Sequence, residues 1–135
     1  MGGPSNRERS GERDLCFSSA MRRVPDVRHA DLDLYQYDPL TRDVEVAFEV
    51  SSDPRKASDL TRRIARKLGA YAVLLIHQPN DNEHKHPVVV STWTPTGKKV
   101  LNKAEMTWSE FIAYMRHLHD LHLDYRNSIA LGNVA

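Results

Sequence analysis

The sequence predicts an α/β domain with a mixed sheet of four to five strands flanked by helices, in the order α-β-β-α-β-β-α. Residues 44–51 alternate apolar and polar side chains, which indicates a strand with one buried face. Residues 71–77 form a nearly continuous apolar run after an amphipathic helical segment, which is typical of a central, buried strand. Strand, helix and strand at this spacing favour a right-handed parallel crossover.

The length of 135 residues fits one domain with two loose ends. Residues 1–11 contain Gly, Pro, Ser, Asn and Arg without apolar periodicity, so we expect a disordered N-terminal arm. A single α/β domain is expected over residues 12–123. The apolar pattern fades after that point, which predicts a loose C-terminal tail over residues 124–135.

Composition narrows the class of protein. Hydrophobic residues make up 40% and charged residues 27%, and the net charge is only +1, so the chain is globular without a bulk basic signal for nucleic acid. A single cysteine excludes an intrachain disulfide, and no apolar run is long enough for a membrane span or a secretory signal. We therefore expect a cytoplasmic protein without membrane contact. Neither a G-x-S-x-G motif nor a Gly-rich phosphate loop is present.

Local patterns predict the elements that precede the crossover. Residues 12–23 allow a short helix, and residues 31–37 alternate Leu32 and Leu34 with polar side chains, which predicts a strand. The short connection from this strand to residues 44–51 implies an antiparallel hairpin.

The crossover helix is predicted from the residues at its ends. Asp53 is a suitable N-cap with Pro54 at the first helical position, and Gly69 is a suitable terminator after Leu68. The apolar stripe of this helix is expected to face the sheet, and it consists of Ala57, Leu60, Ile64 and Leu68.

The last third of the chain predicts two more strands and a helix. Residues 88–93 have the composition of a strand, and residues 98–101 suit a short edge strand after the turn at Gly97. Thr107 and Glu110 have the spacing of a capping box. The helix that they open carries one apolar face, formed by Trp108, Phe111, Ile112, Met115 and Leu118.

Two carboxylates in the hairpin are the main candidates for chemistry. A register that places Tyr37 opposite Glu45 also places Asp33 opposite Glu49 on the same face. Carboxylates this close stay ionised only with a cation between them, and oxygen ligands suit Mg²⁺ or Mn²⁺. Such an ion could activate water and neutralise a scissile phosphate. The alternative is that both acids lie on an ordinary solvated strand face.

Three stretches, ADLDLYQYDP, VEVAFEVSS and LTRRIARKLGAYAVLLIHQP, resemble the core of the PD-(D/E)xK nuclease superfamily, also called restriction-endonuclease-like. The resemblance covers roughly residues 12–93 and is to small phage and actinobacterial members. It implies a DNA endonuclease that depends on Mg²⁺ or Mn²⁺, with Asp33 as the first metal ligand and Glu49 as the second. It also implies Glu12, on the first helix, as an accessory acid.

The catalytic motif departs from the family at one position. Ser51 stands where the family has Lys, and a hydroxyl cannot supply the positive charge that stabilises the phosphate. Some members take the lysine from the following helix, and here Lys56 or Arg55 could reach back. The alternative is a degenerate, non-catalytic module that binds nucleic acid or a host protein, as a phage accessory protein in the host cytoplasm.

Partners remain open between several alternatives. Nucleases of this fold often dimerise to cut two strands, so a homodimer is one expectation, and a structural role in a phage particle is a third class. The crossover helix is basic, and its cations either contact DNA phosphates or form a solvated face. The candidate DNA contacts are Arg55, Arg62, Arg63, Arg66 and Lys67.

Aromatic and histidine side chains give weaker signals. Tyr35, Tyr37 and Trp93 could stack on bases. His119 and His122 are i, i+3 neighbours on the last helix, which suits a metal. No cysteine or carboxylate completes a tetrahedral set with them at a convincing spacing, so a zinc site is not expected.

Overall fold

The computed structural model describes residue 25 and residues 34–132. The chain divides into two units after Asp31, and the described helices and strands all belong to the second unit. They are β1 (Leu34–Tyr37), β2 (Val44–Ser51), α2 (Asp59–Leu68), β3 (Tyr71–Ile76), β4 (Val88–Trp93), β5 (Lys99–Met106) and α3 (Trp108–Ala130). The α/β class and the mixed five-stranded sheet are confirmed. The expected helix over residues 12–23 lies outside the described residues.

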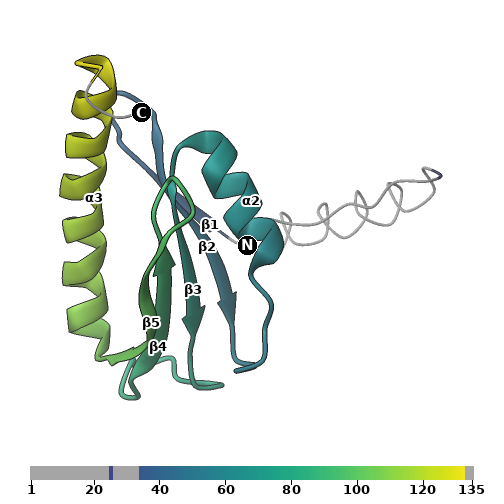
Figure 1. Ribbon diagram of the computed structural model, residues 1–135. Helices are drawn as coiled ribbons and strands as arrows, with labels where there is room; N and C mark the ends of the chain where they lie inside the picture. Colours follow the sequence, from purple (N-terminus) through teal and green to yellow (C-terminus); the bar gives the residue numbers. More distant parts are fainter. Residues whose placement is uncertain (1–24, 26–33, 133–135) are drawn as a thin grey trace, which may run out of the picture. The chain divides into compact units, whose positions relative to one another are not determined.

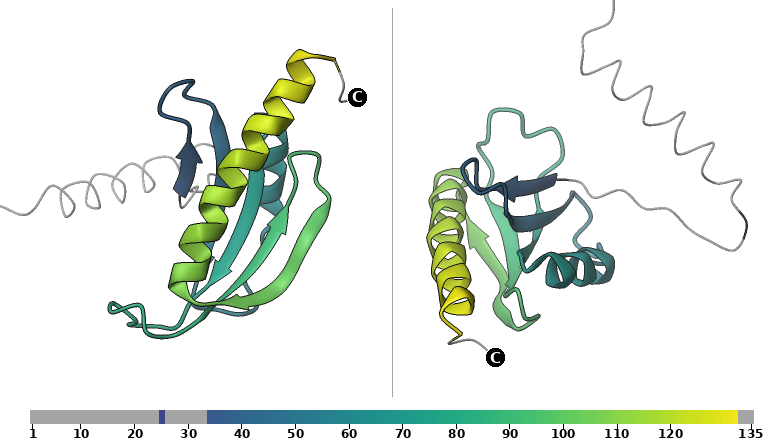
Figure 2. Two further views of the ribbon diagram at one scale, coloured as in Figure 1. Left: turned by 90° about the vertical axis from the view of Figure 1, so that its left-hand side faces the viewer. Right: turned by 90° about the horizontal axis from the view of Figure 1, so that it is seen from above.

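The strands follow their order in the chain, β1-β2-β3-β4-β5. The hairpin β1–β2 is antiparallel, β2 and β3 are parallel, and the pairs β3–β4 and β4–β5 are antiparallel. The expected parallel pairing of these two strands is therefore confirmed, and α2 connects them. The helices α2 and α3 cover opposite faces of the sheet (Figures 1 and 2). Neither combines the length and the apolar character needed to cross a membrane.

The α3 face of the sheet holds the main hydrophobic core. Alternate residues of β2, β3 and β4 point to this face and meet the apolar stripe of α3. Its buried members are Val46, Phe48, Tyr71, Val73, Leu75, Val88, Val90, Phe111, Met115 and Leu118. The predicted capping box of α3 is present, with Thr107 Oγ1 accepting from the Glu110 N–H and the Glu110 carboxylate accepting from the Thr107 N–H.

The α2 face is packed with small side chains, and this corrects the predicted orientation of the helix. Thr61 and Ala65 are its buried residues, whereas Leu60 and Leu68 of the expected stripe are 51% and 46% exposed. The alanines of β2, β3 and α2 let the helix approach the sheet closely through its smallest side chains. The cluster beneath α2 consists of Ala47, Ala65, Ala70, Ala72 and Trp93.

The start of α2 also differs from the prediction. The helix begins at Asp59 after Ser58, so Asp53 is not its N-cap. The Asp53 carboxylate instead accepts the N–H of Arg55 (2.9 Å), and its carbonyl accepts the N–H of Lys56 (3.1 Å). These bonds form a turn that competes with helical hydrogen bonding, which is common for Asp.

A β-bulge in the hairpin corrects a second prediction. Leu34, Tyr35 and Gln36 pair with Phe48, Ala47 and Val46, which is the expected register. The register then shifts, so that Tyr37 lies opposite Val44 and not opposite Glu45. An extra residue in one strand reverses the alternation of side chains. Glu45 therefore faces α3, whereas Glu49 faces α2.

Two elements are longer than the sequence pattern indicated. The edge strand β5 runs to Met106, well beyond residue 101. Helix α3 continues to Ala130, into the segment where a loose tail was expected. Residues far away in the sequence hold the second half of α3. Arg126 Nη2 lies 3.1 Å from Asp43 Oδ2, and His122 Nε2 lies 2.9 Å from the Gly69 carbonyl oxygen.

Candidate functional site

Glu49 lies on the α2 face near the carboxyl end of β2, and its side chain is 13% exposed. Thr61 Oγ1, on α2, donates a hydrogen bond to Glu49 Oε2 at 3.0 Å. Lys56 Nζ lies 3.4 Å from Glu49 Oε1. The lysine thus reaches back to the carboxylate, although it does so from the turn before α2 and not from the helix itself.

The other predicted catalytic residues are placed differently. Ser51 Oγ accepts the N–H of Asp53 at 3.0 Å, so its hydroxyl supports the turn after β2. Arg55 pairs with Asp53 and does not approach Glu49 in the way that Lys56 does. Asp33 and Glu12 lie outside the described residues.

The predicted DNA contacts on α2 separate into two groups. Arg62 pairs with Asp59 and lies over the Trp93 ring, 5.0 Å from its centroid, so it is drawn toward the sheet. Trp93 is buried in that contact, which removes it from the candidates for base stacking. The exposed cations of the helix are Arg63, Arg66 and Lys67. Tyr35 and Tyr37 are also exposed.

A small cavity lies along the same row of the sheet as Glu49. Leu74 of β3 pairs with Glu49, and Ser91 of β4 pairs with Leu74. Leu74 and Ser91 line a cavity of about 130 Å³, together with Lys103 of β5. The Lys103 N–H donates to Ser91 Oγ at 3.0 Å. Sequence reasoning missed Lys103, because only the sheet order brings β5 to this row.

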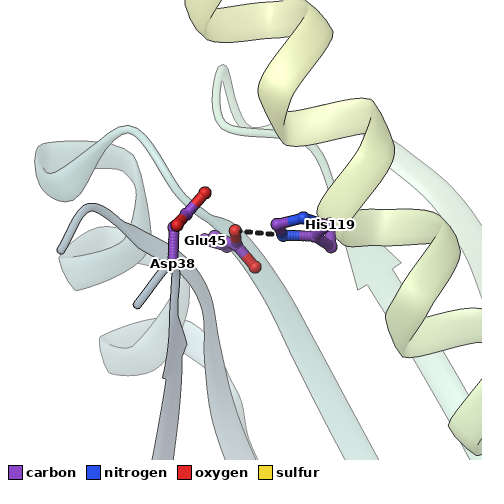
Figure 3. Close-up of side chains that lie close together, drawn as sticks. All are labelled: Asp38, Glu45 and His119. Carbon is purple, nitrogen blue, oxygen red and sulfur yellow. Dashed lines mark hydrogen bonds and ion pairs between the residues drawn. The ribbon is translucent and has the colours of Figure 1, made fainter. Parts of the chain in front are cut away.

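A second cluster lies on the opposite face, where Asp38, Glu45 and His119 converge (Figure 3). Asp38 comes from the turn after β1, Glu45 from the bulge in β2 and His119 from α3. One ligand atom from each lies within 4.8 Å of the other two. Asp38 is 6% exposed and Glu45 is 1% exposed. These three residues could form a metal-binding group.

Hydrogen bonds orient each member of this cluster. Glu45 Oε1 lies 2.5 Å from His119 Nδ1, and Glu45 Oε2 accepts from Gln36 Nε2 at 3.0 Å. Asp38 Oδ1 accepts the N–H groups of Leu40 (2.8 Å) and Thr41 (3.4 Å). The turn therefore fixes the Asp38 carboxylate through one oxygen.

The sequence carried only part of the signal for this cluster. His119 was a metal candidate with His122, but the structure separates the two: His122 is buried against the Gly69 carbonyl, and His119 meets Glu45. Glu45 was expected on the face of Glu49, and the bulge turns it the other way. A pattern of alternation cannot reveal a bulge, so the contact could not be found from spacing.

No family model matches the chain, and no curated protein or solved structure matches it either. A function is therefore assigned from two groups of side chains: Glu49 with Lys56 and Thr61 on the α2 face, and Asp38, Glu45 and His119 on the α3 face.

Proposed function

We propose that the domain is a small metal-dependent DNA phosphodiesterase with a restriction-endonuclease-like core, in which Glu49 is a metal ligand and Lys56 replaces the missing lysine of the motif. The observation that carries the proposal is the contact between Lys56 Nζ and Glu49 Oε1 at 3.4 Å. This contact brings together a carboxylate near the end of β2 and an ammonium from the turn that follows it. The nuclease motif combines an acid and a cation of this kind.

The position of Glu49 in the sheet supports this proposal. Ligands of open α/β sheets bind at the carboxyl ends of parallel strands. Glu49 and its partner Leu74 lie toward that end of the parallel pair β2–β3. The cavity beside Leu74 offers room for part of a substrate, and Lys103 is among the residues that line it.

The donor set suits Mg²⁺ or Mn²⁺, which accept carboxylate oxygens and retain several waters. We assign Asp33 as the first metal ligand beside Glu49 as the second, and Glu12 as an accessory acid. A bound ion supplies a nucleophilic water and neutralises charge on the phosphate. Lys56 is half-exposed, so its ammonium can turn from Glu49 toward a phosphate oxygen when the carboxylate binds a cation.

The exposed cations of α2 extend this surface. Arg63, Arg66 and Lys67 are the residues that we assign to the DNA backbone, with Arg55 at the turn. Contacts of this kind give binding that weakens steeply as salt rises.

A second candidate is a non-catalytic module of the same fold that binds nucleic acid. Both oxygens of Glu49 already have partners in the chain, Lys56 and Thr61, and the Ser51 hydroxyl is used in a turn. Because these partners compensate the charge of the Glu49 carboxylate, it needs no metal ion. This favours a domain that binds nucleic acid without cleaving it.

Cleavage assays with the full chain separate the two candidates. Single-stranded, duplex and branched DNA are incubated with Mg²⁺ or Mn²⁺. We expect cleavage that falls about 100-fold or more in Glu49→Gln, Asp33→Asn and Lys56→Ala. The matched controls are Glu83→Gln and Lys85→Ala, which alter an exposed ion pair in the loop before β4 and should cleave normally.

Intact DNA under all these conditions would contradict the phosphodiesterase. Salt-sensitive DNA binding that is unchanged in Glu49→Gln would then support the binding module. Ser51→Lys is a useful probe of the first candidate, because restored or increased cleavage would show that the remaining groups are competent.

A further inference from the structure

We infer that Asp38, Glu45 and His119 bind one divalent transition-metal ion on the α3 face, at a site separate from Glu49. The inference rests on the burial and convergence of these three side chains and does not depend on the proposed nuclease activity.

The charges of the cluster call for a cation. Asp38 and Glu45 are both buried, and their ligand atoms lie within 4.8 Å of each other. Two carboxylates at this separation repel, and burial removes the water that screens them. Within residues 34–132, His119 is the basic side chain in ion-pair contact with either acid. Arg116, one turn earlier on α3, lies 3.8 Å from Asp120 instead.

A bulge and several hydrogen bonds hold the three side chains of the cluster in place. The bulge in β2 turns Glu45 toward the α3 face. An apolar side chain at this buried position would avoid the free-energy cost of desolvating a carboxylate. Gln36 fixes one Glu45 oxygen, and the turn bonds of Asp38 fall on Oδ1, so that Oδ2 is not needed for the turn. Hydrogen bonds from neighbouring groups orient the ligands of metal sites in this way.

The ligand atoms indicate the class of metal. One imidazole nitrogen with two carboxylate oxygens suits Zn²⁺, Mn²⁺ or Co²⁺, whereas Mg²⁺ and Ca²⁺ prefer oxygen alone. A tetrahedral ion with bonds of about 2.1 Å separates its ligands by about 3.4 Å, so modest side-chain movement closes the present set. The cluster borders an open groove between the hairpin turn and α3, which leaves a coordination position for water.

Such an ion would join the hairpin to the long helix. Asp38 and Glu45 belong to the β1–β2 hairpin, and His119 belongs to α3 (Figure 3). A ligand that binds only the folded state raises its stability in proportion to the logarithm of ligand concentration. The melting temperature of the full chain should therefore rise with added metal.

Titration calorimetry with ZnCl₂ and MnCl₂ tests the inference on the full chain, with the visible absorption of Co²⁺ as a second readout. We expect one strong site for Zn²⁺ and Co²⁺, and Mn²⁺ binding at this site that is lost with the same variants. His119→Gln and Asp38→Asn should each weaken Zn²⁺ binding about 100-fold or more, because loss of a residue that only orients a ligand already costs about 10- to 100-fold. His119→Gln can keep a hydrogen bond to Glu45, and circular dichroism confirms that each variant folds.

The matched control is His117→Gln, which removes an exposed histidine from the same helix and should leave binding unchanged. Glu49→Gln should also retain the strong Zn²⁺ site of the α3 face, since Glu49 lies on the other face. The inference is overturned if the folded wild type binds none of the three ions, or if His117→Gln weakens binding as much as His119→Gln. Loss in only one of His119→Gln and Asp38→Asn would equally contradict a shared site.

Discussion

The two faces of the sheet are packed in different ways. On the α3 face, large side chains such as Phe48, Leu75 and Leu118 interlock in a continuous core. On the α2 face, alanines such as Ala47 and Ala72 meet Ala65 of a shorter helix. Large side chains gain stability from the area that they bury, whereas small ones allow close approach but bury little. Most of the stability should therefore come from the α3 face.

This difference also separates the two candidate sites. On the α2 face, Glu49 is 13% exposed and pairs with Lys56, and its row of the sheet borders a small cavity that Lys103 also lines. The long helix α3 closes over Glu45 and holds it in the core. The α2 face thus places one acid beside a cation, whereas the α3 face buries two acids beside a histidine.

The largest expected effect is the loss of a core residue on the α3 face. Leu118→Ala should destabilise the fold by about 3 kcal/mol, because it removes buried methyl groups and leaves a cavity. Urea denaturation followed by circular dichroism measures this change. Leu60→Ala on the outer side of α2 is the control and should cost less than about 1 kcal/mol. Equal costs for the two variants would show that the core is not concentrated on one face.

The next effect concerns close packing beneath α2. Ala65→Leu should destabilise the protein by about 2 kcal/mol, because the added atoms have no space between the helix and the sheet. Ala113→Leu places the same side chain on the exposed surface of α3 and should be nearly neutral. Thermal melts compare the two variants. A neutral or stabilising Ala65→Leu would mean that α2 does not approach the sheet closely.

The smallest effect is a pH dependence in the loop between β3 and β4. Desolvation raises the pKa of Asp81, but hydrogen bonds from the N–H groups of His86 and Lys85 and from the Trp108 indole outweigh it and hold that pKa below its ordinary value. The stability that Asp81 contributes should be present above its unfolded-state pKa of about 3.9 and lost as pH falls through the lower folded-state pKa.

Denaturation curves between neutral and acidic pH check this prediction. Asp81→Asn should lose part of the acid dependence of the free energy of unfolding, whereas Glu83→Gln in the same loop should retain it. Identical acid profiles for wild type and Asp81→Asn would contradict an anchored loop.

Local patterns predicted much of the fold, and long-range contacts decided the rest. The alternation of residues 44–51 and the Thr107–Glu110 capping box depend on near neighbours, so they could be recognised from sequence. The orientation of α2 depends on the alanines of two distant strands, and the direction of Glu45 depends on a bulge. Lys56 and Arg55 were both predicted to be able to reach back, and of the two it is Lys56 whose ammonium lies beside Glu49. His119 was a metal candidate, but its contact with Glu45 spans 74 positions and no local pattern indicated that partner.

Anomalous diffraction from a Mn²⁺-soaked crystal tests the central claim that each face of the sheet carries its own cation site. We predict two anomalous peaks, one within coordination distance of the Glu49 carboxylate and one among Asp38, Glu45 and His119. Well-ordered carboxylates on both faces with a peak at only one of the two sites, or at neither, would contradict this claim.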